Sequence, residues 1–459
     1  MNVIRQYSIN KNGAVGLVML IFILLSSILT LSLSVFVLQW LLASITIPFL
    51  LKKDHEAVKT YSLIFIVSLI FMFLVYYGNE LYYGQPYYAG GSDDMKYEEW
   101  GHDVYNANML NPYRVVKSGI IGQFHNSPFF AVYISLLIRL SSFFDGYSTF
   151  MPRIVNIYLL IWVCFIMEYF LRKYTKLNEQ KILISIAFFA LTPNIQYINS
   201  YIFRDTFNLL QILAIPYLVD RILRARGSRH FRRKTILYLL ALVFFIFTMY
   251  FTRRNSLAFS GVLSLLVISE IYKIKKRNII IALVPILILT NAVEGLNIGK
   301  YISGYTSYVL SGSDGLSRIV FSQALLPAGV FLRAAYALIS PFPNFLTLFK
   351  EPTKILLDII TFLVYLGVLA QILAIPFILR RIARVGFDWL TISFLSFFLA
   401  VIIATFTFRH VILYFPFLVA VAVDGYKSIE INDSRVLLFA AWIAVICMGL
   451  LYTVLKFVM

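Results

Sequence analysis

Between two apolar runs the chain reads Gly90-Gly91-Ser92-Asp93-Asp94-Met95-Lys96-Tyr97-Glu98-Glu99-Trp100. This stretch is the centre of a polar segment, residues 84–126, that also carries two histidines, Arg114 and Lys117. The paired glycines let the backbone turn sharply directly before the aspartates. The aromatic side chains suit an interface at which one edge of each ring is hydrated. We therefore expect the functional site to lie in this segment.

The composition is that of a membrane protein. The chain has 459 residues, of which 60% are hydrophobic and 14% are charged, and its mean hydropathy is +0.81. These values are typical of a polytopic membrane protein and leave no room for a large soluble domain. The first apolar run, 13–51, is far longer than the apolar region of a signal peptide, so we expect no cleavable signal. Cys164 and Cys447 lie inside apolar runs, which argues against a disulfide framework or a cysteine metal site.

The net charge of +18 is explained by membrane topology. Basic residues collect at short junctions between apolar runs, as the positive-inside rule predicts for cytoplasmic loops. These junctions are Lys52-Lys53, Arg172-Lys173, 224–234, 273–277 and Arg380-Arg381. Because no basic folded surface remains, we expect no nucleic-acid partner.

The basic junctions place the N-terminus in the cytoplasm and residues 78–126 in a large first outer loop with juxtamembrane helices. We predict an all-α polytopic protein of the plasma (cytoplasmic) membrane, with about 12–14 transmembrane helices in one transmembrane domain, 1–459. In a second outer loop, 293–353, the apolar stretch 319–340 is expected to lie along the membrane or dip into it. The other expected crossings are 14–51 as two short spans, 60–77, 182–195, 205–224, 236–252, 256–272, 279–292, 355–378, 388–406, 411–425 and 436–456.

One region leaves the topology open. The runs 127–143 and 151–171 count as two crossings, which would leave the basic residues 172–181 outside. Either one of these runs does not cross the membrane, or this loop breaks the charge rule. No role is therefore assigned to Arg139, Asp145 and Arg153.

Several arginines fall on the expected outer face, against the positive-inside bias. Snorkelling of the side chain to lipid headgroups explains any one of them. Several such sites beside an acidic loop favour phosphate binding, because the guanidinium fork matches phosphate oxygens. Arg318 also falls on this face. The candidate substrate- and phosphate-binding residues are Arg204, Asp205, Arg253, Arg254, Arg333, Arg409, His410, Arg114 and His125.

The chain resembles the GT-C type of membrane glycosyltransferase, in the group of protein O-mannosyltransferases and lipid A aminoarabinose transferases. The likeness covers most of the chain in short motifs: Asp93-Asp94, His125-Asn126-Ser127-Pro128-Phe129, Pro152-Arg153-Ile154-Val155-Asn156, Arg204-Asp205, Arg253-Arg254, Ser340-Pro341-Phe342-Pro343 and Arg409-His410. The chain departs from the group at His125, where the lipid A transferases carry a lysine-proline-proline sequence.

The resemblance implies an enzyme that moves a sugar from a polyprenyl-phosphate-linked donor to an acceptor hydroxyl of a glycan, lipid or protein on the outer side. The residues fit this chemistry independently. Asp94 lies further from the flexible glycines and is favoured as the general base, with Asp93 orienting a neighbour or a metal. Outer arginines would stabilise the departing lipid phosphate. One divalent metal held by Asp93, Asp94 and His125 is considered as a cofactor, although this spacing is not a specific metal signature.

Other interpretations remain open. The paired aspartates also suit a solvated turn, and Asp205 suits a helix N-cap. A polysaccharide polymerase or ligase acting on undecaprenyl-pyrophosphate-linked glycans would use the same arginines, with 293–353 as its catalytic loop. A lipid-linked sugar transporter would carry paired charges in the middle of its spans, whereas these charges lie mostly at span ends.

The predicted orientation can be tested at Ser92. A Ser92→Cys variant should react with a membrane-impermeant thiol reagent in intact cells, because the first outer loop is expected to face the medium. Lys52→Cys, at a junction expected in the cytoplasm, is the control and should react only after permeabilisation. Labelling of Ser92→Cys only after permeabilisation would overturn the orientation.

Overall fold

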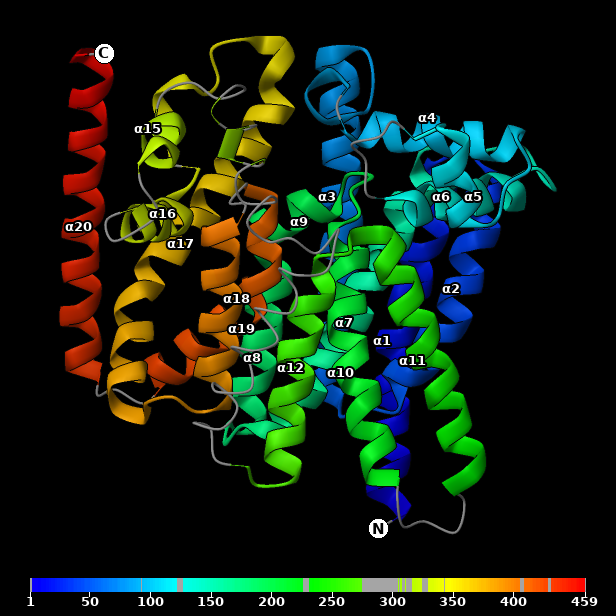
Figure 1. Ribbon diagram of the computed structural model, residues 1–459, viewed down its shortest axis with the longest axis horizontal. Coiled ribbons are helices and arrows are strands. Elements are labelled where there is room, and N and C mark those ends of the chain that lie inside the picture. The colour runs from blue at the N-terminus through cyan, green and yellow to red at the C-terminus, as the bar shows by residue number, and fades with distance from the viewer. Residues whose placement is uncertain are drawn as a thin grey trace. The chain divides into compact units, whose positions relative to one another are not determined.

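The structure of the chain, a computed structural model, is built from helices (Figure 1). It describes residues 2–91, 93–121, 127–225, 231–274, 316–323, 329–341, 343–404, 408–427 and 431–458, with a few single positions between 304 and 310. Within these residues there is no β-strand. The predicted all-α class is therefore confirmed for the described part of the chain.

The chain forms two compact units. Unit 1 comprises Met1–Glu168, Ile195–Val267 and Phe349–Ile360, and unit 2 comprises Tyr169–Asn194, Ile268–Leu348 and Thr361–Met459. Each unit is therefore assembled from separate segments of the sequence.

The helices of each unit are as follows. Unit 1 contains α1 (Asn2–Leu29), α2 (Leu33–Leu51), α3 (His55–Tyr83), η1 (Tyr88–Gly90), α4 (Asp93–Asn106), α5 (Pro112–Ser118), α6 (Pro128–Ser141), α10 (Asp205–Ala225), α11 (Phe231–Arg253) and η4 (Pro352–Lys354). Unit 2 contains α8 (Glu179–Leu191), α15 (Leu316–Ser322), α16 (Val330–Ile339), η3 (Phe345–Thr347), α18 (Trp389–Ala404), η5 (Phe408–His410), α19 (Val411–Lys427) and α20 (Ile431–Val458). The helices that run from one unit into the other are α7 (Phe150–Tyr174), α9 (Pro193–Asn199), α12 (Ser256–Ile271) and α17 (Ile355–Val385).

Among the described residues, 8 helices are long and apolar enough to cross a membrane. The count rises to 9 if α8 and α9, which are bent by 55° at Thr192, form one broken span. A multi-pass membrane protein is thus supported, with fewer full-length spans among the described residues than the number predicted for the chain. Shorter apolar helices, α12 and α18, take the place of the predicted crossings 256–272 and 388–406. The predicted crossing 279–292 lies outside the described residues.

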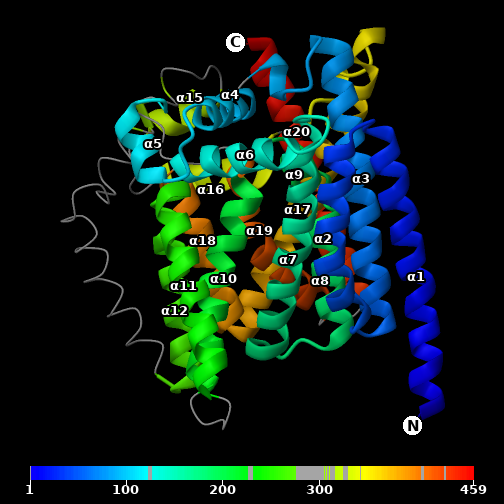
Figure 2. The ribbon, with the colours of Figure 1, turned by 90° about the vertical axis from the view of Figure 1, so that its right-hand side faces the viewer.

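The run 127–143 forms α6, which is too short to be a span. Its 14 residues, at about 1.5 Å each, fall short of the roughly 30 Å of a bilayer core. α6 packs against α4, and Figure 2 shows it lying across the ends of α10 and α11. Between 127 and 171, therefore, only α7 has spanning length. One crossing instead of two removes the conflict between the basic residues 172–181 and the charge rule.

The second predicted outer loop, 293–353, is described in part. Residues 293–303 lie outside the described part of the chain, so a catalytic loop there is untested. The apolar stretch 319–340 contains most of α15 and all of α16. The described part of the expected membrane-associated stretch therefore consists of residues from two short helices.

Asp145 fastens the loop between α6 and α7 to the start of α2. Its carboxylate accepts hydrogen bonds from the backbone amides of Leu33 (2.7 Å) and Ser34 (2.8 Å) and from the Ser34 hydroxyl (2.5 Å). Desolvation acts in the opposite direction, but these bonds lower the pKa of Asp145 to about 2. Asp145 thus satisfies amides that the start of a helix leaves unpaired. Its place in the structure is that of a loop anchor.

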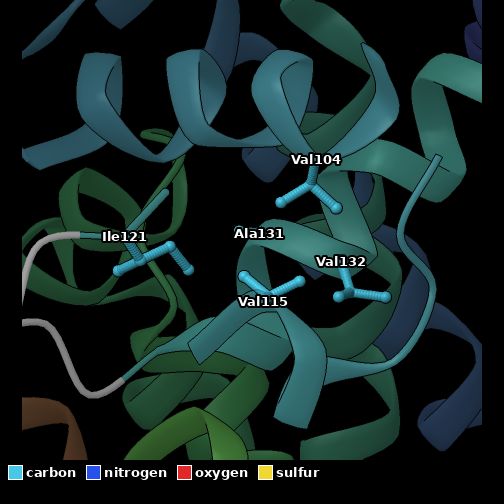
Figure 3. Close-up of a cluster of buried hydrophobic side chains, with 5 residues drawn as sticks. All are labelled: Val104, Val115, Ile121, Ala131 and Val132. Atoms are coloured by element: carbon cyan, nitrogen blue, oxygen red, sulfur yellow. The ribbon is translucent and has the colours of Figure 1, made fainter. Parts of the chain in front are cut away.

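A small apolar core holds α4, α5 and α6 together (Figure 3). It consists of Val104, Val115, Ile121, Ala131 and Val132. Gly101 allows α4 to approach α6 closely, because a Cβ atom at this position would lie 2.3 Å from Cγ2 of Ile134. The position of α4 is therefore fixed by side-chain packing on α6.

Gly101→Ala should destabilise the protein, because the added methyl group overlaps Ile134. The expected loss is about 1–3 kcal/mol, the usual cost of overpacking. This loss exceeds the roughly 1 kcal/mol by which alanine is favoured over glycine in a helix. Gly261→Ala is the control, since no atom lies within 4 Å of a Cβ atom there. Thermal unfolding in detergent should show a lower midpoint for Gly101→Ala alone, and equal midpoints would contradict the close approach.

Candidate functional site

The polar stretch at 90–100 forms a turn followed by α4. The Gln85 side-chain amide donates to the Gly90 carbonyl, which closes the turn. Gly90 and Gly91 have φ values of +76° and +120°, a region in which a side chain is strained. The first turn of α4 holds Asp93 and Asp94, where the helix dipole favours negative charge. Asp93 is half-buried, whereas Asp94 is completely buried.

Asp94 has one satisfied and one unsatisfied oxygen. Its Oδ2 accepts a hydrogen bond from the Tyr88 backbone amide at 2.8 Å. Its Oδ1 has no hydrogen-bond partner within the described part of the chain. Burial raises the pKa of Asp94 above its ordinary value, and the Tyr88 amide and the Arg153 charge reduce that rise. A buried carboxylate oxygen without a hydrogen bond is costly, which makes Oδ1 of Asp94 a candidate atom for contact with a bound group.

Glu98 lies one turn further along α4. The exposed fraction of the residue is 7%, and its carboxylate accepts hydrogen bonds from the hydroxyls of Tyr87 (2.8 Å) and Tyr147 (3.1 Å). Burial raises the pKa of Glu98, while the two hydroxyls and Arg153 act in the opposite direction. The motifs in the sequence indicate no role for Glu98. The sequence does contain one indication of its position. Glu98 follows Asp94 by four residues, and residues i and i+4 lie on one face of a helix.

Arg153, near the start of α7, is the cation beside these carboxylates. It is completely buried and donates to the backbone carbonyls of Ser200 (2.7 Å) and Pro86 (2.5 Å). Its guanidinium also lies over the rings of Tyr76 and Tyr201, 5.5 and 5.8 Å from their centroids. The sequence alone indicates no role for Arg153, because it leaves the topology of this region open. An arginine inside an apolar run was the available signal.

The predicted basic–acidic pairs of unit 1 meet where α11 ends and α10 begins. Arg204 donates to the Thr252 carbonyl at 3.2 Å, and its guanidinium lies 5.8 Å from the centroid of the Tyr97 ring on α4. Arg253 forms a long ion pair with Asp205, 3.5 Å between Nη1 and Oδ1. Of these pairs, Arg204 makes the contact with α4.

The remaining predicted residues are dispersed. Arg254 lies over the Tyr250 ring at 4.6 Å in unit 1. Arg114 is exposed on α5 in the same unit, and His125 lies outside the described residues. Unit 2 holds the buried Arg333, the half-buried Arg409 and the buried His410. The structure therefore places Arg204 against Tyr97 of α4, the helix that carries Asp94, and the late arginines belong to unit 2.

The described residues contain no group of three or more His, Cys, Asp or Glu side chains that could hold a metal ion. Of the predicted metal set, His125 lies outside those residues and Asp94 is completely buried. Asp93 and Asp94 alone do not make a metal site. The divalent metal stays a prediction from the sequence.

The chain matches no protein-family model, no curated protein and no solved structure. The likeness to GT-C glycosyltransferases therefore rests on the short sequence motifs. The chemistry of the residues around α4 is therefore the main indication of function.

Glu98→Gln should change how stability depends on pH. Burial raises the pKa of Glu98 above its ordinary 4.5, so the folded protein binds this proton more tightly than the unfolded chain does. The stabilisation from protonated Glu98 is complete below pH 4.5 and is lost as pH rises through the folded-state pKa. The wild type should therefore lose thermal stability relative to Glu98→Gln as pH rises.

The measurement is the thermal midpoint of both proteins over a range of pH, with Glu99→Gln, an exposed carboxylate on the same turn, as the matched control. If the wild type gains stability relative to Glu98→Gln with rising pH, the environment described for Glu98 is wrong.

Proposed function

We propose that this protein is a membrane glycosyltransferase. It moves a sugar from a polyprenyl-phosphate-linked donor to a hydroxyl of a glycan, lipid or protein acceptor, with Asp94 as the general base. The observation that carries this proposal is the buried Asp94 carboxylate, whose Oδ1 has no hydrogen-bond partner among the described residues. Such an oxygen is suited to accept the hydroxyl proton of a bound acceptor.

In the proposed reaction, one bond forms and one bond breaks at the anomeric carbon. The acceptor oxygen forms a bond to the anomeric carbon of the sugar, and its proton passes to Asp94. The bond between the anomeric carbon and the phosphate oxygen breaks, and the phosphate leaves with the electron pair. The raised pKa of Asp94 favours this role, because a base works best when its pKa lies near the working pH.

Arg204 is the arginine best placed to serve the leaving phosphate in unit 1. Its guanidinium lies over Tyr97, three residues after Asp94, so it stands beside the helix that carries the base. A guanidinium stabilises the negative charge that develops on a departing phosphate. Arg253 is paired with Asp205 and would support Arg204 from the end of α11. Arg254 and Arg114 remain further proposed ligands for the donor in unit 1, and a role for Arg333, Arg409 and His410 remains a prediction from the sequence.

The distribution of basic residues indicates on which side of the membrane the proposed reaction takes place. Lys52 and Lys53, between α2 and α3, lie at the opposite end of α3 from α4. Arg224 lies at the end of α10 remote from Arg204. Basic ends favour the cytoplasm. This supports an N-terminus in the cytoplasm and a site at the outer face of the plasma membrane.

The acceptor reaches Asp94 only when the structure opens. Asp94 is completely buried, and the segment that contacts it carries Tyr88 and the positive-φ glycines Gly90 and Gly91. The proposal therefore includes a movement of residues 86–91 on binding. No step is assigned to a metal.

The test is sugar transfer from a lipid-linked donor by purified Asp94→Asn and Asp93→Asn. Asparagine keeps the size and hydrogen bonding of aspartate but cannot take up the proton. Asp94→Asn should lower turnover by roughly two to four orders of magnitude, the usual worth of general-base catalysis, with donor binding retained.

Asp93→Asn is the adjacent comparison and should be less affected, and Asp103→Asn, an exposed aspartate of α4, is the control for folding. Near-normal turnover of Asp94→Asn would sink the assignment of the base, because asparagine is as good a turn residue as aspartate.

A further inference from the structure

Three segments of unit 1 converge on the guanidinium of Arg153. The side chain starts on α7 and is completely buried. One terminal nitrogen, Nη1, donates to the Ser200 carbonyl in the connection between α9 and α10. The other, Nη2, donates to the Pro86 carbonyl in the connection between α3 and α4. A planar guanidinium can hold two carbonyls in fixed directions, which a point-like ammonium cannot do equally well.

The Pro86 contact leads directly to the two buried carboxylates of α4. Tyr87 donates from its hydroxyl to Glu98 at 2.8 Å, and Tyr88 donates from its backbone amide to Asp94 at 2.8 Å. Both donors therefore follow immediately after the carbonyl that Arg153 holds. Fixing Pro86 fixes the segment that orients both carboxylates.

We propose that Arg153 is the positioning residue of Asp94 and Glu98, acting through the backbone of residues 86–88. This assignment rests on the proposed function in so far as these carboxylates serve catalysis. The charge of Arg153 has a second effect, because a cation nearby favours the ionised form of both carboxylates. Geometry and charge thus come from one side chain.

The surroundings of the two carboxylates limit what else could play this part. Among the described residues, the groups with the largest effects on the two carboxylates include the hydroxyls of Tyr87 and Tyr147, each other's carboxylate, and Arg153. Arg204 reaches α4 at the ring of Tyr97. Arg153 combines both properties: its charge acts on Asp94 and on Glu98, and its hydrogen bond holds the connecting segment.

A buried arginine could instead serve only to hold α7 against its neighbours. The two roles differ in what a lysine can replace. Lysine keeps the charge but loses the planar pair of donors, and methionine loses both. If Arg153 positions the carboxylates, Arg153→Lys should keep their titration near that of the wild type but loosen residues 84–91. Arg153→Met should change both properties.

The first measurement is amide hydrogen exchange in the full-length protein in detergent, without substrate. In Arg153→Met, residues 84–91 should exchange about tenfold faster or more, as expected for the loss of a hydrogen bond to a charged group. Arg153→Lys should show the same direction with a smaller change. Arg139→Met is the matched control: Arg139 contacts Asn108 and the Tyr105 ring near the end of α4, and it should leave 84–91 unchanged.

The second measurement is the pH titration of buried carboxyl groups by infrared absorption, assigned with Asp94→Asn and Glu98→Gln. Arg153→Met should move this titration to higher pH, whereas Arg153→Lys should restore it. Unchanged exchange at 84–91, faster exchange spread evenly over the molecule, or an unmoved titration in Arg153→Met would each overturn the positioning role.

Neither measurement needs turnover, so the two proposals fail separately. Exchange and titration that behave as expected, in a wild type that transfers no sugar, would refute the glycosyltransferase alone. If the wild type transfers sugar, and hydrogen exchange at 84–91 is the same in the wild type and in Arg153→Met, the positioning role alone is refuted.

Discussion

A single buried guanidinium holds two stretches of irregular backbone at one end of unit 1. The donors of Arg153 reach the carbonyls of Pro86 and Ser200, neither of which lies in a helix. Away from water, a backbone carbonyl without a hydrogen bond is costly. A helix pairs its carbonyls internally, whereas irregular backbone needs partners from elsewhere. One planar side chain that reaches both carbonyls removes this cost in two places. The turn at 86–91 and the start of α4 depend on that contact.

The opposite end of α3 is secured differently. There Lys53 pairs with the buried Glu168 at 2.6 Å, and the Tyr61 hydroxyl donates to the same carboxylate at 2.5 Å. In unit 2, Arg381 pairs with both Asp388 and Asp424. These cations lie beside carboxylates, so their charges are balanced within the protein. Such closed pairs suit anchoring, and they leave little attraction for an external anion.

Much of the helical framework could be predicted from the sequence. Apolar runs bounded by basic residues gave α2, α3, α10 and α11 near their expected places, because spanning length and flanking charge are local properties. The sharp turn before α4 also follows from sequence, since Gly90 and Gly91 adopt positive φ as paired glycines allow.

What could not be predicted depends on contacts between distant segments. α6 is as apolar as a span, and only its length and its packing on α4 through Gly101 show that it lies across the bundle. Nothing in the local sequence distinguishes Glu98 from other glutamates. Its environment depends on the hydroxyl of Tyr147, 49 residues away, which donates a hydrogen bond to it. Asp145 is similarly defined by α2, more than a hundred positions earlier. Hydropathy and motifs do not contain this information.

The buried arginines divide by how their charge is balanced. Arg333 of α16 donates to the Ile403 carbonyl at 3.2 Å and lies over the Phe321 ring at 4.6 Å. A carbonyl and a ring are polar and aromatic partners that do not cancel its charge, and its Nε has no hydrogen-bond partner among the described residues. Asp94 and Glu98 interact favourably with Arg153, whereas among the described residues no carboxylate lies within ion-pair distance of Arg333. A buried cation with neutral partners keeps its attraction for an anion, whereas a cation beside carboxylates has its charge balanced within the protein.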